Sequence, residues 1–411
     1  MRNQVNKSLQ TDNHQNKLIM RNAISIALLS LLVTVTMISC NSTPLDQYIT
    51  DKKNQAGIIG IQAGYVGPNG NEWHGSYGFR NYKTGEAVND STLFMIASSA
   101  KPVTALAILK LHDEGKLNLD DNINRYIPFS VVNPHSPSNS ITFRMLLSHT
   151  STIQDNWEVL DPLYTIEEGG DSPLVLSDFV QDYFTISGDY YYPKKNFYKE
   201  TPGQYWSYSN MGYALLGYAV EEISGLSFSE YMNQEIFEPL EMMNSYWFLN
   251  NIPHQNIARP HQLPVEEDKD ITPKMLPHYG YPAFPDGQLR TTTKDYLKFI
   301  KLIVDGGRIN GNQFISEDLI KQYHTIQYPS VHQYQAISFN YNEFEDWMYY
   351  LFMRRLPSHT GSDPGVASVV SFDPEQKTAA VVFVNSPPNT VIGGKTFYLD
   401  LPKRLLNEAA K

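Results

Sequence analysis

The β-prone segments of this 411-residue chain lie near its two ends, and helical patterns fill the middle. An apolar, β-prone run at 57–66 precedes a Gly- and Pro-containing turn and a second run at 72–79. Near the other end, β-branched runs at 365–372 and 378–384 flank another turn. One sheet assembled from both termini is the simplest way to bury these runs. The sequence therefore predicts an α+β fold: an antiparallel sheet built from both chain ends, flanked by helices, with a mainly helical inserted subdomain at roughly 110–280.

Amphipathic periodicity places the helices. Apolar residues recur at helical spacing from Lys101 to a stop at Gly115, and again over 211–224 before Gly225. Further helices are expected at 228–240, 292–305 and 399–410. The composition, 41% hydrophobic and 18% charged, predicts a large core and no general disorder, and we expect one domain over 56–411. The net charge of −11 argues against nucleic acid as a partner.

The first 39 residues have the pattern of a signal peptide. Lys17 and Arg21 precede an apolar run at 23–35 that is too short to span a bilayer, and the only cysteine, Cys40, follows. This junction resembles a bacterial lipobox, which implies lipidation at Cys40 and a polar tether over 40–55. A plain signal peptide is the alternative. We therefore expect a lipid-anchored protein of the bacterial cell envelope, facing the periplasm or the cell surface.

Ser98 and Lys101 form the only S-x-x-K in the chain, between an apolar run at 93–97 and an expected helix. Three residues make about one helical turn, so the hydroxyl and the ammonium share a face. A lysine with a lowered pKa can take the proton of a serine, and a helix N-terminus presents N–H groups to a developing oxyanion. Because the pattern also arises by chance, its interpretation depends on the other motifs of the chain.

Two further motifs come later in the sequence. Tyr208-Ser209-Asn210 lies just before the 211–224 helix, where the phenol can relay protons and the amide can hold a substrate carbonyl or Lys101; a helix cap is the alternative. His359-Thr360-Gly361 precedes the strand expected at 365–372, which would form one wall of a site. The backbone N–H of Ser362 would then be a second oxyanion donor.

Two other segments look like these motifs but are rejected as parts of the site. Lys83-Thr84-Gly85 comes before the serine, between Asn81 and Glu86, and its context predicts a hairpin turn. Tyr231-Met232-Asn233 lies within the helix expected at 228–240, where its apolar residues suit a buried face.

With its motifs in this order, the sequence resembles the serine β-lactamase and penicillin-binding-protein superfamily, in which S-x-x-K holds the nucleophile. It is most similar to the branch of class C (AmpC-type) β-lactamases, D-Ala-D-Ala carboxypeptidases, D-aminopeptidases and family VIII esterases. The similar segments are 92–107, 141–151, 201–225 and 284–292. Thr152 stands where the family has Gly, so we expect that turn to differ. His359 replaces the Lys of efficient β-lactamases and is typical of the carboxypeptidase type.

The resemblance implies a role for each motif residue. Ser98 is acylated, while Lys101 and Tyr208 share the general-base and general-acid work. Asn210 positions the substrate amide, and the N–H groups of Ser98 and Ser362 form the oxyanion hole. The residues implied to bind the substrate are Asn210, His359, Thr360, Gly361 and Ser362, of which His359 and Thr360 are the ones implied to face its carboxylate.

The substrate stays open at this point. A D-Ala-D-Ala peptide, a D-amino-acid amide and an ester could each acylate the serine, and a β-lactamase proper is the alternative enzyme. The alternative without efficient catalysis is a binding or sensor protein of the same fold. No G-x-S-x-G elbow and no H-E-x-x-H occurs, and His254 and His261 are expected in a solvated loop, so no metal or cofactor is expected. The expected partners are a small-molecule or peptidoglycan-like peptide substrate and, through Cys40, the membrane. Residues 155–200 match no known segment and are expected to build a substrate-facing wall.

Overall fold

The computed structural model describes residues 43–265, 272–341 and 355–411. The chain forms two units, Met1–Tyr48 and Ile49–Lys411. The expected signal peptide and Cys40 lie outside the described residues. Within residues 44–55 the expected polar tether is wrong, because helix α2 (Pro44–Gln55) occupies them. Thr43 begins this helix: Asp46 N donates to Thr43 Oγ1 at 3.2 Å, while Thr43 N donates to Asp46 Oδ2 at 2.7 Å.

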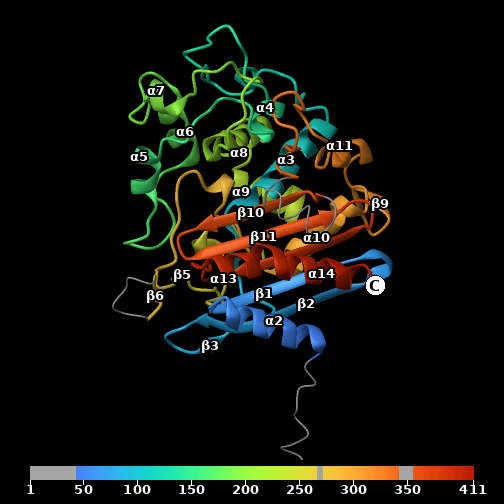
Figure 1. The fold of residues 1–411 in the computed structure, drawn as a ribbon. Coiled ribbons are helices and arrows are strands. Elements are labelled where there is room, and N and C mark those ends of the chain that lie inside the picture. Colours follow the sequence, from blue (N-terminus) through green and yellow to red (C-terminus); the bar gives the residue numbers. More distant parts are fainter. Residues whose placement is uncertain (1–42, 266–271, 342–354) are drawn as a thin grey trace, which may run out of the picture. The chain divides into compact units, whose positions relative to one another are not determined.

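A six-stranded antiparallel sheet draws its strands from both ends of the chain, as predicted (Figure 1). In spatial order the strands are β10, β11, β12, β1, β2 and β3, so β1 and β12 pair at the centre with Ile61 opposite Val384. Every residue of β1, β11 and β12 is buried, which explains their nearly unbroken apolar sequences. The strands are β1 (Gly60–Val66), β2 (Glu72–Asn81), β3 (Glu86–Ala87), β10 (Ser358–Asp363), β11 (Val366–Asp373) and β12 (Thr378–Val384).

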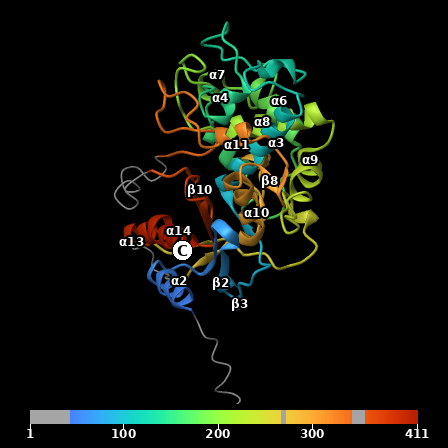
Figure 2. The same cartoon turned by 90° about the vertical axis from the view of Figure 1, so that its right-hand side faces the viewer.

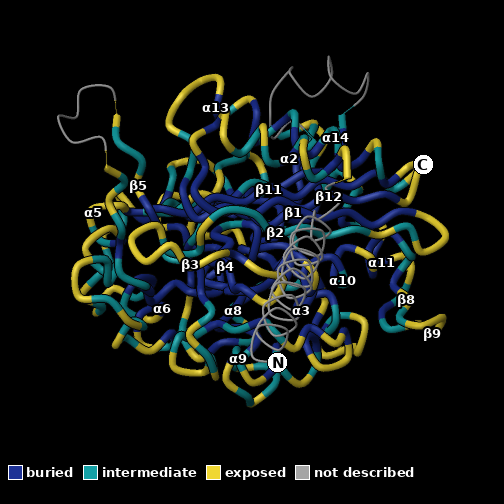
Figure 3. Tube along the Cα trace, turned by 90° about the horizontal axis from the view of Figure 1, so that it is seen from below, coloured by how far each residue is buried: buried dark blue, intermediate teal, exposed yellow. Residues whose placement is uncertain are grey.

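Helices cover both faces of this sheet (Figure 2). Helix α14 (Leu401–Ala409) packs on β12 and β1 from one face, and α10 (Thr293–Val304) packs on the same strands from the other. Figure 3 shows the central strands as buried tube between more exposed loops. This layering places the main core on the α10 face, continuous with the helices that follow β4 (Phe94–Met95).

Two helices position the sequence motifs. Helix α3 (Lys101–Asp113) follows the S-x-x-K serine, and α8 (Asn210–Ser224) begins within the tyrosine motif. The two helices contact each other, so motifs about 110 residues apart meet at their N-terminal ends. Gly225 ends α8 in the left-handed conformation, with φ 74°, as its place in the sequence predicts.

In the sequence, most of the remaining helices come between the N-terminal strands and the C-terminal strands of the sheet. The helix expected at 228–240 is α9, which continues as a π-helical segment at Met232–Phe237. The boundaries of a helical subdomain at roughly 110–280 stay a prediction. In the described part of the chain, no helix is long and apolar enough to cross a membrane. The remaining α-helices are α4 (Phe143–Leu147), α5 (Trp157–Leu160), α6 (Leu176–Phe184), α7 (Pro193–Asn196), α9 (Phe228–Tyr231), α11 (Glu317–Gln322) and α13 (Val391–Lys395).

Candidate active site

Ser98 lies in a single 3-10 turn, Ala97–Ala100, that leads directly into α3. The preceding residue, Ala97, has φ 47°, a left-handed conformation that costs a non-glycine residue about 1–2 kcal/mol. Ser98 is partly exposed, whereas Ser99 is buried and accepts a hydrogen bond from Ser368 Oγ at 2.7 Å. Of the two adjacent serines, Ser98 is therefore the one available to a substrate.

Lys101 is completely buried, and its ammonium makes three hydrogen bonds. Its Nζ donates to Ser98 Oγ at 3.0 Å, to Asn210 Oδ1 at 2.6 Å and to the backbone oxygen of Asp286 at 2.8 Å. Burial lowers the pKa of Lys101, and the nearby carboxylates of Asp286, Asp155 and Asp363 oppose that effect. The arrangement holds a lysine that can lose its proton within reach of a serine hydroxyl.

Asp155 fixes the orientation of Asn210. One carboxylate oxygen accepts hydrogen bonds from Asn210 N at 2.9 Å and Asn210 Nδ2 at 2.8 Å; the other accepts from Met211 N at 3.0 Å. These donors include the first free N–H groups of α8, which favour a carboxylate. Burial raises the pKa of Asp155, against these hydrogen bonds and the charge of Lys101. No sequence motif includes Asp155, because its partners lie 55 residues away.

An aromatic cluster that includes Tyr208 lies beside Lys101 on another side. The Tyr208 ring centroid lies 4.9 Å from Lys101 Nζ, and the His149 and His359 rings lie 4.4 and 6.3 Å from the Tyr208 ring. Ser209 N donates to His149 Nδ1 at 3.1 Å, so the proton of this imidazole is on Nε2. Among the described residues the buried His149 Nε2 has no hydrogen-bond partner. Burial and Lys101 lower the pKa of His149 well below its ordinary value and that of His359 to about 3, so both rings are neutral.

His359, Thr360 and Gly361 lie within a strand rather than before one. They belong to β10, an edge strand of the sheet, which pairs with β11 through a Pro364-Gly365 turn. The expectation that 365–372 forms the wall was therefore wrong by one strand, because β10 is too polar to show a strand pattern in sequence. A Cβ added to Gly361 would lie 2.3 Å from Ile96 O and 3.0 Å from Ser98 N. Glycine thus lets β10 pass directly beside the Ser98 turn.

Alternation along β10 decides which side chains flank Ser98. His359 and Asp363 share the face of Gly361, while Thr360 and Ser362 point to the opposite face. Thr360 is half-buried and Ser362 is exposed. The neutral His359 and the carboxylate of Asp363 therefore lie on the two sides of the point where Gly361 meets Ser98.

Two carboxyl groups that the sequence did not single out complete this side of the site. Tyr164 Oη donates to Asp363 Oδ1 at 3.4 Å, and Tyr281 Oη donates to Asp363 Oδ2 at 3.1 Å. Burial raises the pKa of Asp363 to about 6 and that of Asp286 to about 8, although Lys101 opposes both shifts. Both carboxyl groups are enclosed and have few cations nearby, so keeping both of them charged costs free energy.

A small pocket opens beside these groups, with room for about one water-sized group. Its wall includes residues 157–164 from the beginning of the 155–200 region, and the substrate-facing role expected for that region stays a prediction. The Tyr164 and Tyr281 rings lie 4.3 Å apart in this wall. The lining residues are Trp157, Leu160, Leu163, Tyr164, Asn210, Tyr281, Pro282, Ala283 and Asp286.

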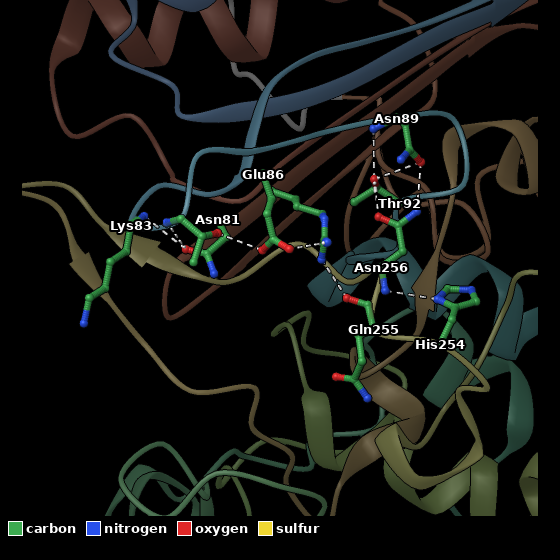
Figure 4. Close-up of polar contacts among 10 residues, drawn as sticks. Asn81, Lys83, Glu86, Asn89, Thr92, His254, Gln255 and Asn256 are labelled. Atoms are coloured by element: carbon green, nitrogen blue, oxygen red, sulfur yellow. Dashed lines mark hydrogen bonds and ion pairs between the residues drawn. The ribbon is translucent and has the colours of Figure 1, made fainter.

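The rejected motifs lie elsewhere. Lys83 and Thr84 form the exposed β2–β3 turn, where both backbone N–H groups donate to Asn81 Oδ1, and the Lys83 side chain points away from its labelled neighbours (Figure 4). Tyr231 is buried in α9. Neither Lys83 nor Tyr231 is among the hydrogen-bond partners of Ser98 and Lys101 in the described ranges.

The expectation of a solvated loop is wrong for His261. His261 is fully buried in β5 (His261–Gln262), where Tyr82 N donates to its Nε2 at 3.3 Å. His254 is partly exposed and accepts from Asn256 N at 3.2 Å, within the network drawn in Figure 4. In the three described ranges, no His, Cys, Asp and Glu side chains gather in a group of three that could hold a metal ion.

Comparison with known proteins identifies the architecture. A family model described as Beta-lactamase matches residues 45–402. Protein flp of Staphylococcus aureus (strain MRSA252) is 26% identical over 315 residues, which are 75% of this chain and 56% of that relative. The chain therefore spans little more than half the length of this relative.

Two solved structures have the same fold. The octameric penicillin-binding protein homologue from Pyrococcus abyssi has a TM-score of 0.67 and 24% identity, over 85% of this chain and 75% of its own. D-amino acid amidase from Ochrobactrum anthropi SV3, complexed with L-phenylalanine amide, has a TM-score of 0.66 and 19% identity, over 89% of this chain and 98% of its own. At this level of identity, the likeness shows the fold alone.

Proposed function

The chain belongs to the beta-lactamase family, and from this premise we propose that it is a serine hydrolase that forms an acyl-enzyme at Ser98. Its substrates are amides or esters, as for a D-amino-acid peptidase or an esterase of this family. The observation that supports this proposal most directly is the 3.0 Å contact between Ser98 Oγ and the buried Nζ of Lys101. A buried lysine with a lowered pKa is a base matched to a serine hydroxyl.

The proposed reaction has two halves. Neutral Lys101 accepts the hydroxyl proton as Ser98 Oγ attacks the carbonyl carbon, and the N–H groups of Ser98 and Ser362 stabilise the oxyanion. Collapse of the tetrahedral intermediate breaks the bond to the leaving group, which takes a proton through Lys101 or Tyr208. Water then attacks the ester carbonyl, gives its proton to the same pair and releases the acid and free Ser98.

The charges around Ser98 favour an amidase, an aminopeptidase or an esterase over an enzyme whose substrate carries a carboxylate near the scissile bond, such as a β-lactamase. β-Lactams and peptide C-termini carry a carboxylate, which a cationic residue would best receive. His359 is neutral because its pKa is lowered to about 3, and Asp363 lies on the same face of β10. The named activity of the similar amidase structure agrees with this choice. A binding protein without turnover is the weaker alternative, since all the implied catalytic side chains are present.

Intact-mass analysis tests the proposed nucleophile. We expect incubation with a fluorophosphonate, or with a p-nitrophenyl ester at early times, to add one acyl or phosphonyl mass to the wild-type protein and none to Ser98→Ala. Ser99→Ala is the matched control, because Ser99 is the neighbouring serine but faces Ser368; it should keep the adduct. An adduct on Ser98→Ala, or no adduct and no turnover in the wild type, would exclude the mechanism. Rapid hydrolysis of a penicillin would instead favour a β-lactamase.

We also propose that the mature protein is anchored by lipid at Cys40, in the bacterial envelope. This proposal depends on the sequence pattern around Cys40, which is the only cysteine. In cells, Cys40→Ala should move the protein out of the detergent-soluble membrane fraction and abolish labelling by an alkyne fatty acid. Unchanged labelling would contradict the anchor.

A further inference from the structure

We propose that His149 is a positioning residue for the reaction: it holds Tyr208 where the phenol can pass a proton between Lys101 and the leaving group. The inference rests on the proposed acyl-enzyme at Ser98, and it gives a role to a residue that none of the three site motifs includes. His149 acts through Tyr208 and does not itself exchange a proton with the substrate.

His149 contacts three consecutive residues around the tyrosine. Its backbone oxygen accepts from Ser207 N at 2.9 Å, and its Nδ1 accepts from Ser209 N at 3.1 Å. Between these two hydrogen bonds, the imidazole ring lies 4.4 Å from the Tyr208 ring, at an interplanar angle of 31°. One residue therefore fixes the backbone on both sides of Tyr208 and also packs against its ring.

Tyr208 needs such support because it lies outside the helix that follows it. Helix α8 begins at Asn210, so its helical hydrogen bonds do not include Tyr208. The tyrosine is 36% exposed, yet its ring centroid lies 4.9 Å from the buried Nζ of Lys101. A side chain at the edge of solvent has fewer packing contacts than one in the core. The position of the phenol beside Lys101 therefore depends on the buried ring and the two backbone hydrogen bonds of His149.

His149 is itself firmly held, and its ring chemistry points to the same role. It is 1% exposed, and its ring lies 5.3 Å from the Tyr213 ring of α8. Because Nδ1 accepts, the ring proton is on Nε2, and in the described part of the chain this buried N–H has no hydrogen-bond partner. An unpaired buried N–H costs free energy that a phenyl ring would avoid. What the imidazole supplies in return is the acceptor Nδ1, which holds Ser209.

The imidazole can play this part only in its neutral form. In the imidazolium, Nδ1 would carry a proton and face the N–H of Ser209. Burial, and after it the charge of Lys101, lowers the pKa of His149 well below its ordinary value, so Nδ1 stays an acceptor at neutral pH. A general base would instead need a pKa near the working pH. The environment of His149 thus suits holding a neighbour and does not suit proton exchange.

The dependence of the rate on the leaving group tests the inference. p-Nitrophenyl acetate and phenyl acetate have the same acyl group and nearly the same shape, but phenolate is the more basic leaving group and gains more from a proton. The ratio of kcat/KM for the phenyl ester to that for the p-nitrophenyl ester measures this proton donation, and the amount of folded protein cancels from it. We expect Tyr208→Phe to lower the ratio at least about tenfold. His149→Phe, which keeps a ring and removes the acceptor, should lower it about fivefold.

The double variant shows whether His149 acts through Tyr208. With both residues changed to Phe, the ratio should equal that of Tyr208→Phe alone within about twofold, because no phenol is left to hold. A ratio lowered by the product of the two single effects would overturn the inference. So would a wild-type ratio in either single variant, or a wild type that hydrolyses only the p-nitrophenyl ester, while Ser98-dependent turnover upheld the hydrolase. No Ser98-dependent turnover of either ester would end both.

Two amide variants serve if His149→Phe does not fold. Asparagine places an acceptor oxygen where His149 has Nδ1 and tolerates the left-handed backbone there, φ 58°, whereas glutamine is one bond longer and reaches the position of Nε2. We expect His149→Asn to keep the wild-type ratio and His149→Gln to lower it. Equal ratios would contradict the role of Nδ1. His261→Phe is the control, because His261 is also a buried histidine whose ring accepts a backbone N–H, that of Tyr82 at 3.3 Å; its ratio should equal that of the wild type.

Discussion

Asp155→Asn should weaken both the start of α8 and the Ser98–Lys101 pair. The Asp155 carboxylate accepts from Asn210 N, Met211 N and Asn210 Nδ2 at 2.8–3.0 Å and from Ser209 Oγ at 3.3 Å. An asparagine side chain has a single acceptor oxygen, and its NH2 group would face donors. At least two of the four hydrogen bonds must therefore break.

The expected cost in the free energy of unfolding is about 2–4 kcal/mol. Hydrogen bonds to a charged acceptor contribute about 1.5–3 kcal/mol each, and the helix N-terminus adds about 0.5–1 kcal/mol. Against this, burial raises the pKa of Asp155, which shows that holding the charge there already costs free energy that a neutral asparagine avoids. The net value therefore lies below the simple sum.

The same change should slow acylation. Where the NH2 group of the asparagine replaces Oδ2, Asn210 Nδ2 loses its acceptor, so Asn210 Oδ1 no longer holds Lys101 Nζ at 2.6 Å. A displacement of about 1 Å at a catalytic group can cost about a hundredfold in rate. We expect the rate of Ser98 modification by a fluorophosphonate to fall by about 10- to 100-fold.

Asp295→Asn provides the matched control. Asp295 is also a buried carboxylate in the first turn of a helix, α10, where it accepts from Asn244 N at 2.5 Å, far along the chain from the motifs. Urea unfolding should show a comparable loss of stability in both variants, whereas only Asp155→Asn should slow acylation. If Asp155→Asn loses stability but reacts at the wild-type rate, Asp155 is structural only and its coupling to Lys101 through Asn210 is refuted.

Three other predictions each concern one side chain. Burial raises the pKa of Asp286 from 3.8 to about 8, so the native state binds this proton more tightly than the unfolded state and loses stability as pH rises from 4 to 8. In urea unfolding, the stability of Asp286→Asn relative to wild type should therefore grow over this pH range. A constant difference would contradict the prediction. The pKa of His359 is lowered from 6.5 to about 3, so wild type should lose stability relative to His359→Gln as pH falls from 6.5 to 3. Urea unfolding at each pH measures this difference. Parallel plots of stability against pH for the two proteins would show that the native state does not hold His359 in its neutral form. Lys83→Ala should keep kcat/KM within about twofold, because the β2–β3 turn is exposed and outside the site; a large loss would restore the rejected K-T-G.

The sequence could reveal Ser98, Lys101 and Asn210 because their chemistry requires short spacings at helix starts. It could not reveal Asp155 or Asp286, whose contacts to Asn210 and Lys101 span 55 and 185 residues and leave no local period. Asp286 does lie in the 284–292 segment that resembles the family, but a resemblance does not say which atom meets a lysine. A polar edge strand such as β10 likewise has no alternation to read, which is why the wall of the site was assigned to the following strand, β11, instead.

Thr152 shows how a departure from the family pattern can still preserve the site. The expectation that its turn differs from one with glycine is not supported by the backbone, because Thr152 has φ 64°, the left-handed conformation that glycine favours. A β-branched residue there costs about 1–2 kcal/mol. Asn133 Nδ2 offsets this by donating to Thr152 Oγ1 at 2.8 Å and to Tyr198 O at 2.9 Å, which ties the turn to the chain that leads to the tyrosine motif. Asp155 follows three residues later, so this turn lies beside the residue whose carboxylate accepts from Asn210 Nδ2 at the start of α8.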